Sequence, residues 1–218
     1  MTTIMAGAGV LVLRQDVDCA DRGTWEKNLS SCWRDVARLL THIQGCYGLK
    51  ALWNIDDSGD TLFLFYWDTA ERCLVFSKST GGREIATELR RSLRAPKKNQ
   101  PCIVVNAEGV STEVMKPGTL LAVLTAKAKS KKREAFAAEL APVYSATGES
   151  LHTQDGFIGH HALWDLDDSR GVHAIAVWES LEKRLAYERT IAPGVRGRTE
   201  TVLEGPFPRP KYVVVKTL

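Results

Sequence analysis

The chain has 218 residues, of which 44% are hydrophobic and 25% charged, with a formal net charge of +3. These values are ordinary for a globular protein, and the charge is too small to indicate a nucleic-acid or anionic-membrane partner. No apolar run approaches the roughly 18 residues of a membrane-spanning helix, and the N-terminus lacks the basic region of a signal peptide. We therefore expect a cytoplasmic protein that binds neither nucleic acid nor membrane.

In chain order, the first half predicts a strand, a helix, two strands joined by an acidic turn, a helix in two pieces and a short last strand. The predicted ranges are 9–17, 24–43, 46–53, 61–67, 71–78 with 83–93, and 102–106. Thr24 and Thr69 are the expected helix N-caps because their hydroxyls can accept a backbone N–H. The basic stretch 96–101, with proline at both ends, is predicted to be a linker. The order β-α-β-β-α-β is that of a ferredoxin-like α+β fold.

The second half repeats this pattern. Residues 51–69 and 162–180 are identical at seven of 19 positions, and Trp178 stands in the second segment where Trp67 stands in the first. We call the distance along the chain from Trp67 to Trp178 the repeat spacing. Shifting each predicted element by the repeat spacing reproduces the apolar pattern without a gap. The sequence therefore predicts two ferredoxin-like repeats, 1–111 and 112–218.

The predicted third strand indicates how the repeats pack. In 61–67 both faces are apolar, whereas a strand with one solvated face alternates apolar and polar residues. We therefore expect the two repeats to bury these faces by packing sheet to sheet within one chain.

The five cysteines all lie in the first half, and no pair has the spacing of a metal-binding or redox motif. They are Cys19, Cys32, Cys46, Cys73 and Cys102. An odd number without repeat counterparts predicts free thiols in a reducing compartment.

Two short motifs carry a family resemblance. Gly156-Phe157-Ile158-Gly159 enters a predicted strand, and Trp178-Glu179-Ser180 closes the next. With the element order, they resemble the antibiotic-biosynthesis-monooxygenase family, whose members form dimeric α/β barrels. The chain resembles two such subunits fused into an intramolecular pseudo-dimer. The resemblance implies a family that includes cofactor-free oxygenases converting anthrones to quinones, heme-degrading enzymes and proteins without known chemistry.

The sequence departs from both enzymatic branches. The resemblance places the iron-ligating histidine of the heme-degrading branch at Ser77 and Glu188, so heme degradation is not expected. The asparagine of the quinone-forming branch would lie at Phe63 and Ala174, which puts the standard oxygenase mechanism in doubt. No dinucleotide or P-loop fingerprint is present, and an enzyme of this sequence is expected to need no organic cofactor.

The two repeats differ in the size of their side chains. On the Trp67 face the third strand carries Phe63 and Phe65, whereas on the Trp178 face it carries Ala174 and Ala176. Because protein interiors pack tightly, the first repeat is expected to be filled and the second to have room for a ligand. We therefore predict the pocket in the second half, with more space beside Trp178 than beside Trp67.

Candidate catalytic residues follow from that position. His160 and His161 are neighbours on a strand and must point to opposite faces. A hairpin symmetric about Ser169 would place His160 opposite Trp178, where its imidazole could act as a general base. Tyr144, on the helix above, could hydrogen-bond a phenolic ligand. The other interpretations are a histidine bonded to a carbonyl or lying between the sheets, and aromatic side chains that serve only the core.

The predicted catalytic set is therefore His160, Trp178 and Tyr144. The predicted substrate-contacting set is Trp164, Ala174, Ala176 and Trp67. The paired aspartates, 56–57 and 167–168, resemble a metal pair, but their place in hairpin turns favours local turn chemistry and no metal.

These observations lead to one main functional hypothesis. It is a cofactor-independent oxygenase that acts on an aromatic, polyketide-type phenol or anthrone in secondary metabolism, with molecular oxygen as co-substrate. The alternatives are a non-oxidative cyclase, dehydratase or isomerase on a similar substrate, and a binding protein without turnover. The chain could work as a monomeric pseudo-dimer or as a homodimer.

Overall fold

The computed structural model describes residues 2–17, 21–90, 96–190, 197–205 and 208–218. The elements of the first half are β1 (Gly9–Asp16), α1 (Arg22–Thr41), β2 (Cys46–Asn54), β3 (Asp60–Trp67), α2 (Ala70–Lys78), α3 (Thr80–Arg90) and β4 (Pro96–Glu108). Those of the second half are β5 (Leu120–Ala128), α4 (Arg133–His152), β6 (Phe157–Asp165), β7 (Gly171–Trp178), α5 (Leu181–Thr190), β8 (Leu203–Glu204) and β9 (Lys211–Thr217). The chain is thus an α+β protein with antiparallel strand pairing.

The repeat spacing found in the sequence recurs in the element bounds. Helices α1 and α4 match at both ends when one is shifted by this spacing, as do β2 with β6 and β3 with β7. Each half has the ferredoxin-like order, with two hairpin strands between two helical segments.

The strands form one continuous antiparallel ring. Pairing runs in the order β7-β6-β4-β1-β3-β2-β9-β5, and β5 also pairs with β7, which closes the ring. Strand β4 pairs with both β1 and β6, and β9 pairs with both β2 and β5. The last strand of each half is therefore hydrogen-bonded to strands of both halves. The expectation of two sheets packed face to face therefore differs from the observed pairing, because these two strands are shared.

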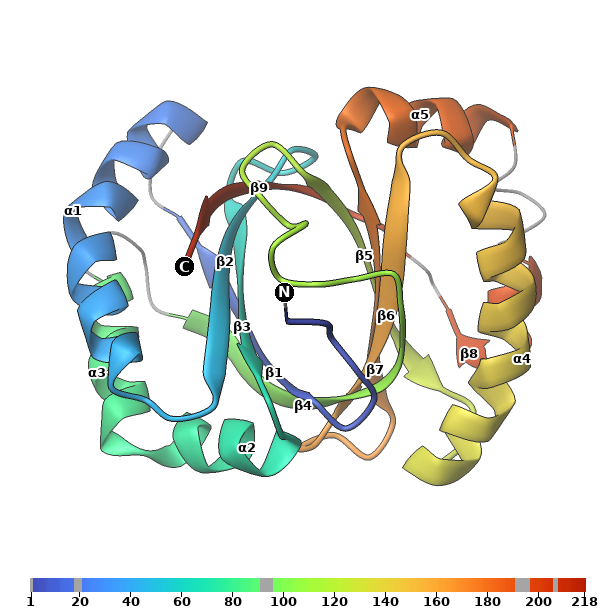
Figure 1. Cartoon of the computed structure of the whole chain (residues 1–218), viewed down its shortest axis with the longest axis horizontal. Coiled ribbons are helices and arrows are strands. Elements are labelled where there is room, and N and C mark those ends of the chain that lie inside the picture. The colour runs from blue at the N-terminus through green and yellow to red at the C-terminus, as the bar shows by residue number, and fades with distance from the viewer. Residues whose placement is uncertain (1, 18–20, 91–95, 191–196, 206–207) are drawn as a thin grey trace.

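Helices cover the ring on two opposite sides, α1, α2 and α3 on one and α4 and α5 on the other (Figure 1). One hydrophobic cluster draws residues from all eight ring strands and from no described helix, which places it inside the ring. Another packs α1, α2 and α3 on the first half, and two smaller ones pack α4 and α5 on the second. Every residue of β3 is buried, as its apolar pattern predicted.

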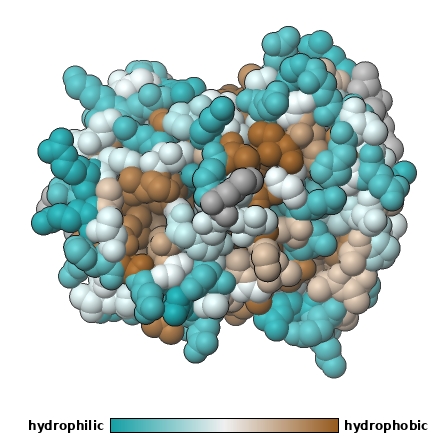
Figure 2. Space-filling model, in the orientation of Figure 1, coloured by the Kyte–Doolittle hydropathy of each residue, from teal (hydrophilic) through white to brown (hydrophobic). Residues whose placement is uncertain are grey.

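Figure 2 shows hydrophilic residues around most of the periphery of one face, with apolar residues gathered nearer its middle.

No helix in the described part of the chain is long and apolar enough to cross a membrane. Four of the five cysteines, Cys32, Cys46, Cys73 and Cys102, carry thiols and not disulfides in the described part of the chain, and Cys19 lies outside the described residues.

Three predicted boundaries were wrong. Helix α1 begins at Arg22 because Asp21, not Thr24, is the N-cap, and the Asp21 carboxylate accepts the Thr24 N–H at 2.9 Å. Helix α3 begins at Thr80 instead of after the two glycines, and its Gly82 lies so close to α2 that a Cβ there would be 2.3 Å from the Phe76 carbonyl oxygen. The predicted linker 96–101 is strand, because it pairs with β1 from Pro96 onward.

Candidate functional site

A largely apolar cavity of about 590 Å³, part of it open to solvent, lies between helices α4 and α5 and the strands of the second half. Small side chains from β5 and β7 form its floor, and longer ones from α4, β6 and α5 form its walls. The lining residues include Ala122, Leu124, Ala174, Ala176, Tyr144, Thr147, Leu151, His160, Arg184, Tyr187, Thr199 and Arg209. Three of the residues predicted from the sequence to contact a ligand in the second half, Tyr144, Ala174 and Ala176, line this one space with His160.

The equivalent space in the first half is filled by side chains. One repeat spacing earlier in the chain, Phe63 and Phe65 stand where Ala174 and Ala176 form the cavity floor. Both phenylalanines are buried, and the Phe63 ring lies 6.2 Å from that of Trp25. The side-chain difference noted in the sequence therefore corresponds to an apolar cavity between helices and sheet in the second half and a packed core at the same place in the first.

A second hollow lies beside Trp67. Its volume, about 1180 Å³ including space open to solvent, exceeds that of the cavity. The prediction of more space beside Trp178 than beside Trp67 is therefore wrong by volume. The hollow is a surface groove, however, because Asp68 and Glu71 on its rim are exposed and Val75 is 64% exposed. It is lined by α2, by the segments that follow α1 and β3, and by the start of α3, and it leaves Trp67 itself 1% exposed.

The register of the β6–β7 hairpin differs from the predicted one. His160 lies opposite Ala176, and Phe157 lies opposite Trp178, with an irregularity between Phe157 and Gly159. The hairpin is centred on Asp168 and not on Ser169, which moves the partner of His160 by two positions, and the irregularity in β6 lies beyond His160 as seen from the turn. Because paired residues share a face of a sheet, His160 still points into the cavity.

The His160 side chain is buried among aromatic rings. Its ring centroid lies 4.4 Å from that of Tyr144 and 6.2 Å from that of Phe157, and the residue is 3% exposed. Neither ring nitrogen has a hydrogen-bond partner within the described chain, and the carboxylate oxygen Oε2 of Glu108 lies 4.0 Å from Nε2. The interpretation of His160 as bonded to a carbonyl therefore does not hold for this structure.

Burial controls the protonation of this imidazole. The pKa of His160 falls to about 4 because burial disfavours the charged form, an effect that Glu108 partly opposes and that His152 reinforces. The ring is therefore neutral near pH 7, and a neutral imidazole has a lone pair that can accept a proton.

Two more polar groups face the cavity without a hydrogen-bond partner in the described chain, Thr147 Oγ1 and Arg184 Nε. Arg184 is 3% exposed and pairs through NH2 with Glu188 Oε1 at 3.0 Å. Its guanidinium lies over the ring of Tyr187, 4.9 Å from the centroid. Unpaired polar atoms in an apolar space are costly, and here they supply a cation, a hydroxyl and an imidazole for a polar ligand.

The predicted tryptophans lie behind the cavity or away from it. Trp178 is fully buried between Phe157 and Tyr187, with ring centroids at 5.2 Å and 5.0 Å, and it does not line the space. Trp164 packs on Phe136 at 5.4 Å, also outside the cavity lining. Trp67 belongs to the first-half core and shares no site with His160.

The remaining candidates have structural surroundings. His161 points into the ring interior, where its Nε2 lies 3.4 Å from Tyr66 Oη. The Asp57 and Asp168 carboxylates accept backbone N–H groups of their own turns, as turn chemistry predicts. No cluster of three or more potential ligands that could hold a metal is found among the described residues.

Sequence reasoning missed the polar residues on the helices, although a signal for them exists. When the halves are aligned by the repeat spacing, Thr147, His160 and Arg184 stand where the first half has Val36, Leu49 and Cys73. Those three first-half residues are buried, two of them with aliphatic side chains and the third with a thiol. Comparing the halves at buried positions, and not only along the third strand, singles out all three polar residues.

Comparisons with known proteins agree with this fold. An anthrone oxidase-like protein superposes with a TM-score of 0.69 at 16% identity, over 99% of this chain and 95% of its own. A candidate monooxygenase from Fusobacterium nucleatum gives 0.68 at 12% identity, over 98% and 95%. A monooxygenase-like protein from Listeria innocua gives 0.53 at 9% identity, over 97% and 95%. At these identities the likeness concerns the fold.

No functionally curated protein matches the sequence. The model of one family, antibiotic biosynthesis monooxygenase, matches residues 119–192. That segment runs from the start of β5 through α5 and carries most of the cavity lining. This segment of the second half thus matches the antibiotic biosynthesis monooxygenase family, as the resemblance carried by its two short motifs predicted.

Proposed function

We propose that the protein is a cofactor-independent oxygenase that oxidises an acidic aromatic compound, of the phenol or anthrone type, in the second-half cavity. The observation that carries the proposal is a neutral, buried imidazole at the wall of an apolar space. His160 has no hydrogen-bond partner in the described chain, and its pKa of about 4 keeps it unprotonated at pH 7. Such a group is free to accept a proton from a bound substrate.

The reaction begins with proton transfer. An anthrone has a CH₂ group between two aromatic rings, and His160 removes one of its protons to leave a carbanion delocalised over the rings. The carbanion lies beside the new imidazolium and offsets the cost of charging a buried ring. The weak basicity of His160 requires a substrate whose anion is well stabilised.

Oxygen then reacts with the electron-rich carbon. The carbanion transfers electrons to O₂ and forms a C–O bond, and the resulting hydroperoxide loses water to leave a carbonyl. One oxygen atom of O₂ enters the product and the other leaves as water, so the CH₂ group becomes C=O without an external reductant. The protein contributes orientation, a dry site and the proton transfers.

Arg184 and Thr147 have a separate role in this scheme. Their unpaired atoms face the same space as His160. A guanidinium stabilises the phenolate or enolate oxygen on which much of the carbanion charge resides. Tyr144, whose ring packs on that of His160 at an interplanar angle of 43°, forms an aromatic wall against which a planar substrate can lie.

We also propose that the chain is a fused pseudo-dimer of two units, 1–111 and 112–218, in which only the second has kept an open pocket. The repeated element bounds and the shared strands β4 and β9 support this proposal. Internal fusion supplies the partner that a single unit would obtain by dimerising. A cytoplasmic monomer in a secondary-metabolite pathway is the corresponding physiological proposal.

The test is product analysis of a hydroxyanthrone incubated with the protein in air and under nitrogen. The proposal predicts quinone in air, with one atom of ¹⁸O₂ in the new carbonyl, and no product under nitrogen. Product formed equally under nitrogen would replace the oxygenase with a non-oxidative cyclase, dehydratase or isomerase. Binding without any product would leave a ligand-binding protein.

A further inference from the structure

The buried position of His160 raises the question of where its proton goes. In the proposed reaction the captured proton can return to the peroxide formed from the substrate, but a base that is 3% exposed needs neighbouring groups to exchange that proton with solvent. A carboxylate and a second imidazole lie between His160 and the solvent. Glu108 Oε2 is 4.0 Å from His160 Nε2, and Glu108 Oε1 is 3.0 Å from His152 Nε2.

We propose that Glu108 and His152 form a proton path between His160 and solvent. This inference rests on the proposed function, in which His160 gains and loses a proton during catalysis. The imidazolium of His160 passes its proton to the Glu108 carboxylate, which passes it to His152 or directly to water. Only protons move along this path, and each group returns to its starting state after one cycle.

Strand register places the carboxylate beside the base. Glu108 is the last residue of β4 and pairs with His160 of β6. Because cross-strand partners project from the same face of a sheet, the two side chains point toward α4 together. The residue comes from the strand that joins the halves, so the path needs the first half of the chain.

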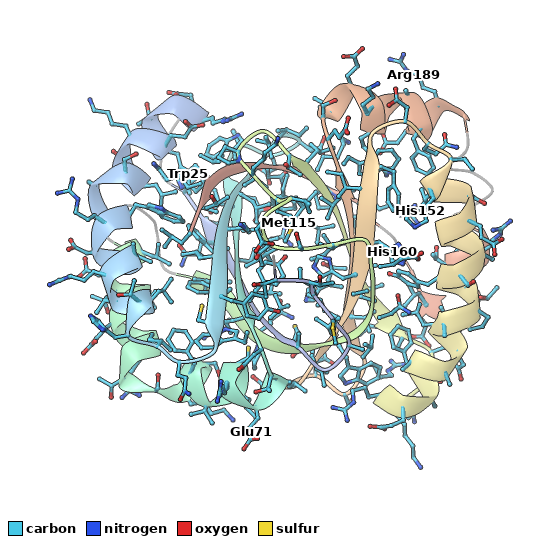
Figure 3. The ribbon with its side chains drawn as sticks, in the orientation of Figure 1. Trp25, Glu71, Met115, His152, His160 and Arg189 are labelled. Atoms are coloured by element: carbon cyan, nitrogen blue, oxygen red, sulfur yellow. The ribbon has the colours of Figure 1, made fainter. Side chains whose placement is uncertain are left out.

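The outer end of the path meets solvent. The side chains of Glu108 and His152 are 50% and 42% exposed, and both line a polar hollow of about 740 Å³ on the outer side of Tyr144. Figure 3 shows His152 and His160 in the space between β6 and α4, with His152 nearer the end of the helix. As the last residue of α4, His152 also lies where the helix dipole favours a positive charge.

A glycine in α4 makes room for the carboxylate. A Cβ on Gly148 would lie 2.8 Å from Glu108 Oε2 and 3.7 Å from His160 Cε1. Glycine inside a helix costs about 1 kcal/mol relative to alanine, and Gly148 is buried within α4. The lack of a side chain there leaves Glu108 its place between the two imidazoles.

The experiment measures proton exchange in the protein alone, so it does not depend on turnover. The exchange of the His160 ring N–H with water is followed by NMR, with magnetisation transfer from water, in the wild type and four variants. Glu108→Gln and His152→Gln remove the path, and Gly148→Ala displaces Glu108 while favouring the helix. Glu149→Gln is the control, because Glu149 is exposed and lines the same hollow, and the substitution removes the same charge as Glu108→Gln.

The path predicts exchange at least about tenfold slower in Glu108→Gln and in Gly148→Ala, with smaller slowing in His152→Gln and none in Glu149→Gln. Exchange at the wild-type rate in Glu108→Gln would overturn the proposal, as would equal slowing in Glu149→Gln. If slow exchange in Glu108→Gln is accompanied by no quinone formation in the wild type, the path stands and the oxygenase function fails. Thermal unfolding of each variant confirms that it is folded.

Discussion

Filling the cavity with the side chain that fills the first half should abolish ligand binding while leaving the protein folded. The change is Ala174→Phe, which introduces the residue found at the equivalent position, Phe63. A phenyl group on β7 would occupy the space between the strand and α4 that Ala174 now lines. Burial of the ring gains about 2 kcal/mol, and imperfect fit costs about 1–3 kcal/mol. The free energy of unfolding should therefore change by little more than ~1 kcal/mol.

The effect on binding should be much larger. A ligand ring excluded by the new phenyl would lose roughly 100 Å² of apolar contact, which at ~25 cal/mol per Å² is about 2.5 kcal/mol. That loss raises the dissociation constant by nearly two orders of magnitude. Isothermal titration with a hydroxyanthrone or a stable anthraquinone measures it, and denaturant unfolding measures stability on the same samples.

The matched control is Val75→Phe, which adds the same ring at the rim of the groove beside Trp67. Val75 is 64% exposed, so little change in stability or affinity is expected there. An unchanged dissociation constant for Ala174→Phe in a folded protein, or a loss of binding confined to Val75→Phe, would refute the assignment of the ligand to the second-half cavity.

Three other changes test the site and the core. In the folded state the pKa of His160 is about 4, against 6.5 in the unfolded chain. Between these two pH values the unfolded chain binds a proton that the folded chain does not. The free energy of unfolding therefore falls as the pH is lowered from 6.5 to 4. The free energy of unfolding of the wild type, measured with urea, should thus decline between pH 7 and pH 4, and His160→Leu should make that decline about 3 kcal/mol smaller. An equal decline in the two proteins would contradict the low pKa. Arg184→Met should weaken binding of an anionic phenol by about 1.5–3 kcal/mol and leave a neutral analogue unaffected, whereas equal losses would indicate a packing role. Phe63→Ala should lower the free energy of unfolding by about 3–5 kcal/mol, since this ring is fully buried in the first-half core; a loss below ~1 kcal/mol would mean that the first half is not filled as described.

Much of the fold could be predicted because each half repeats the pattern of the other. The apolar strands and the repeat spacing determine the element order, and a side chain's face on a strand follows from alternation. The ring closure could not be predicted in this way. It depends on β4 and β9 pairing with strands of the other half, and nothing in their local sequence distinguishes an edge strand from a shared one.

The candidate site was predictable to the extent that it depends on size and alternation. Ala174, Ala176 and the orientation of His160 follow from those two properties. Arg184 and Glu108 reach the site from a helix and from another strand, so their positions depend on tertiary packing. The predicted register of the hairpin was wrong for a local reason, because the turn is centred on Asp168 and not on Ser169, which moves the partner of His160 by two residues.

In the proposed function, oxygen chemistry takes place in the second half at His160. Its most direct test is the initial rate of oxygen uptake with a hydroxyanthrone, measured with an oxygen electrode for the wild type, His160→Leu and Trp67→Phe. We expect uptake above the uncatalysed rate in the wild type, a loss of at least about 100-fold in His160→Leu, and full uptake in Trp67→Phe. Uptake no faster than the uncatalysed rate, or full activity in His160→Leu, would contradict the proposed function.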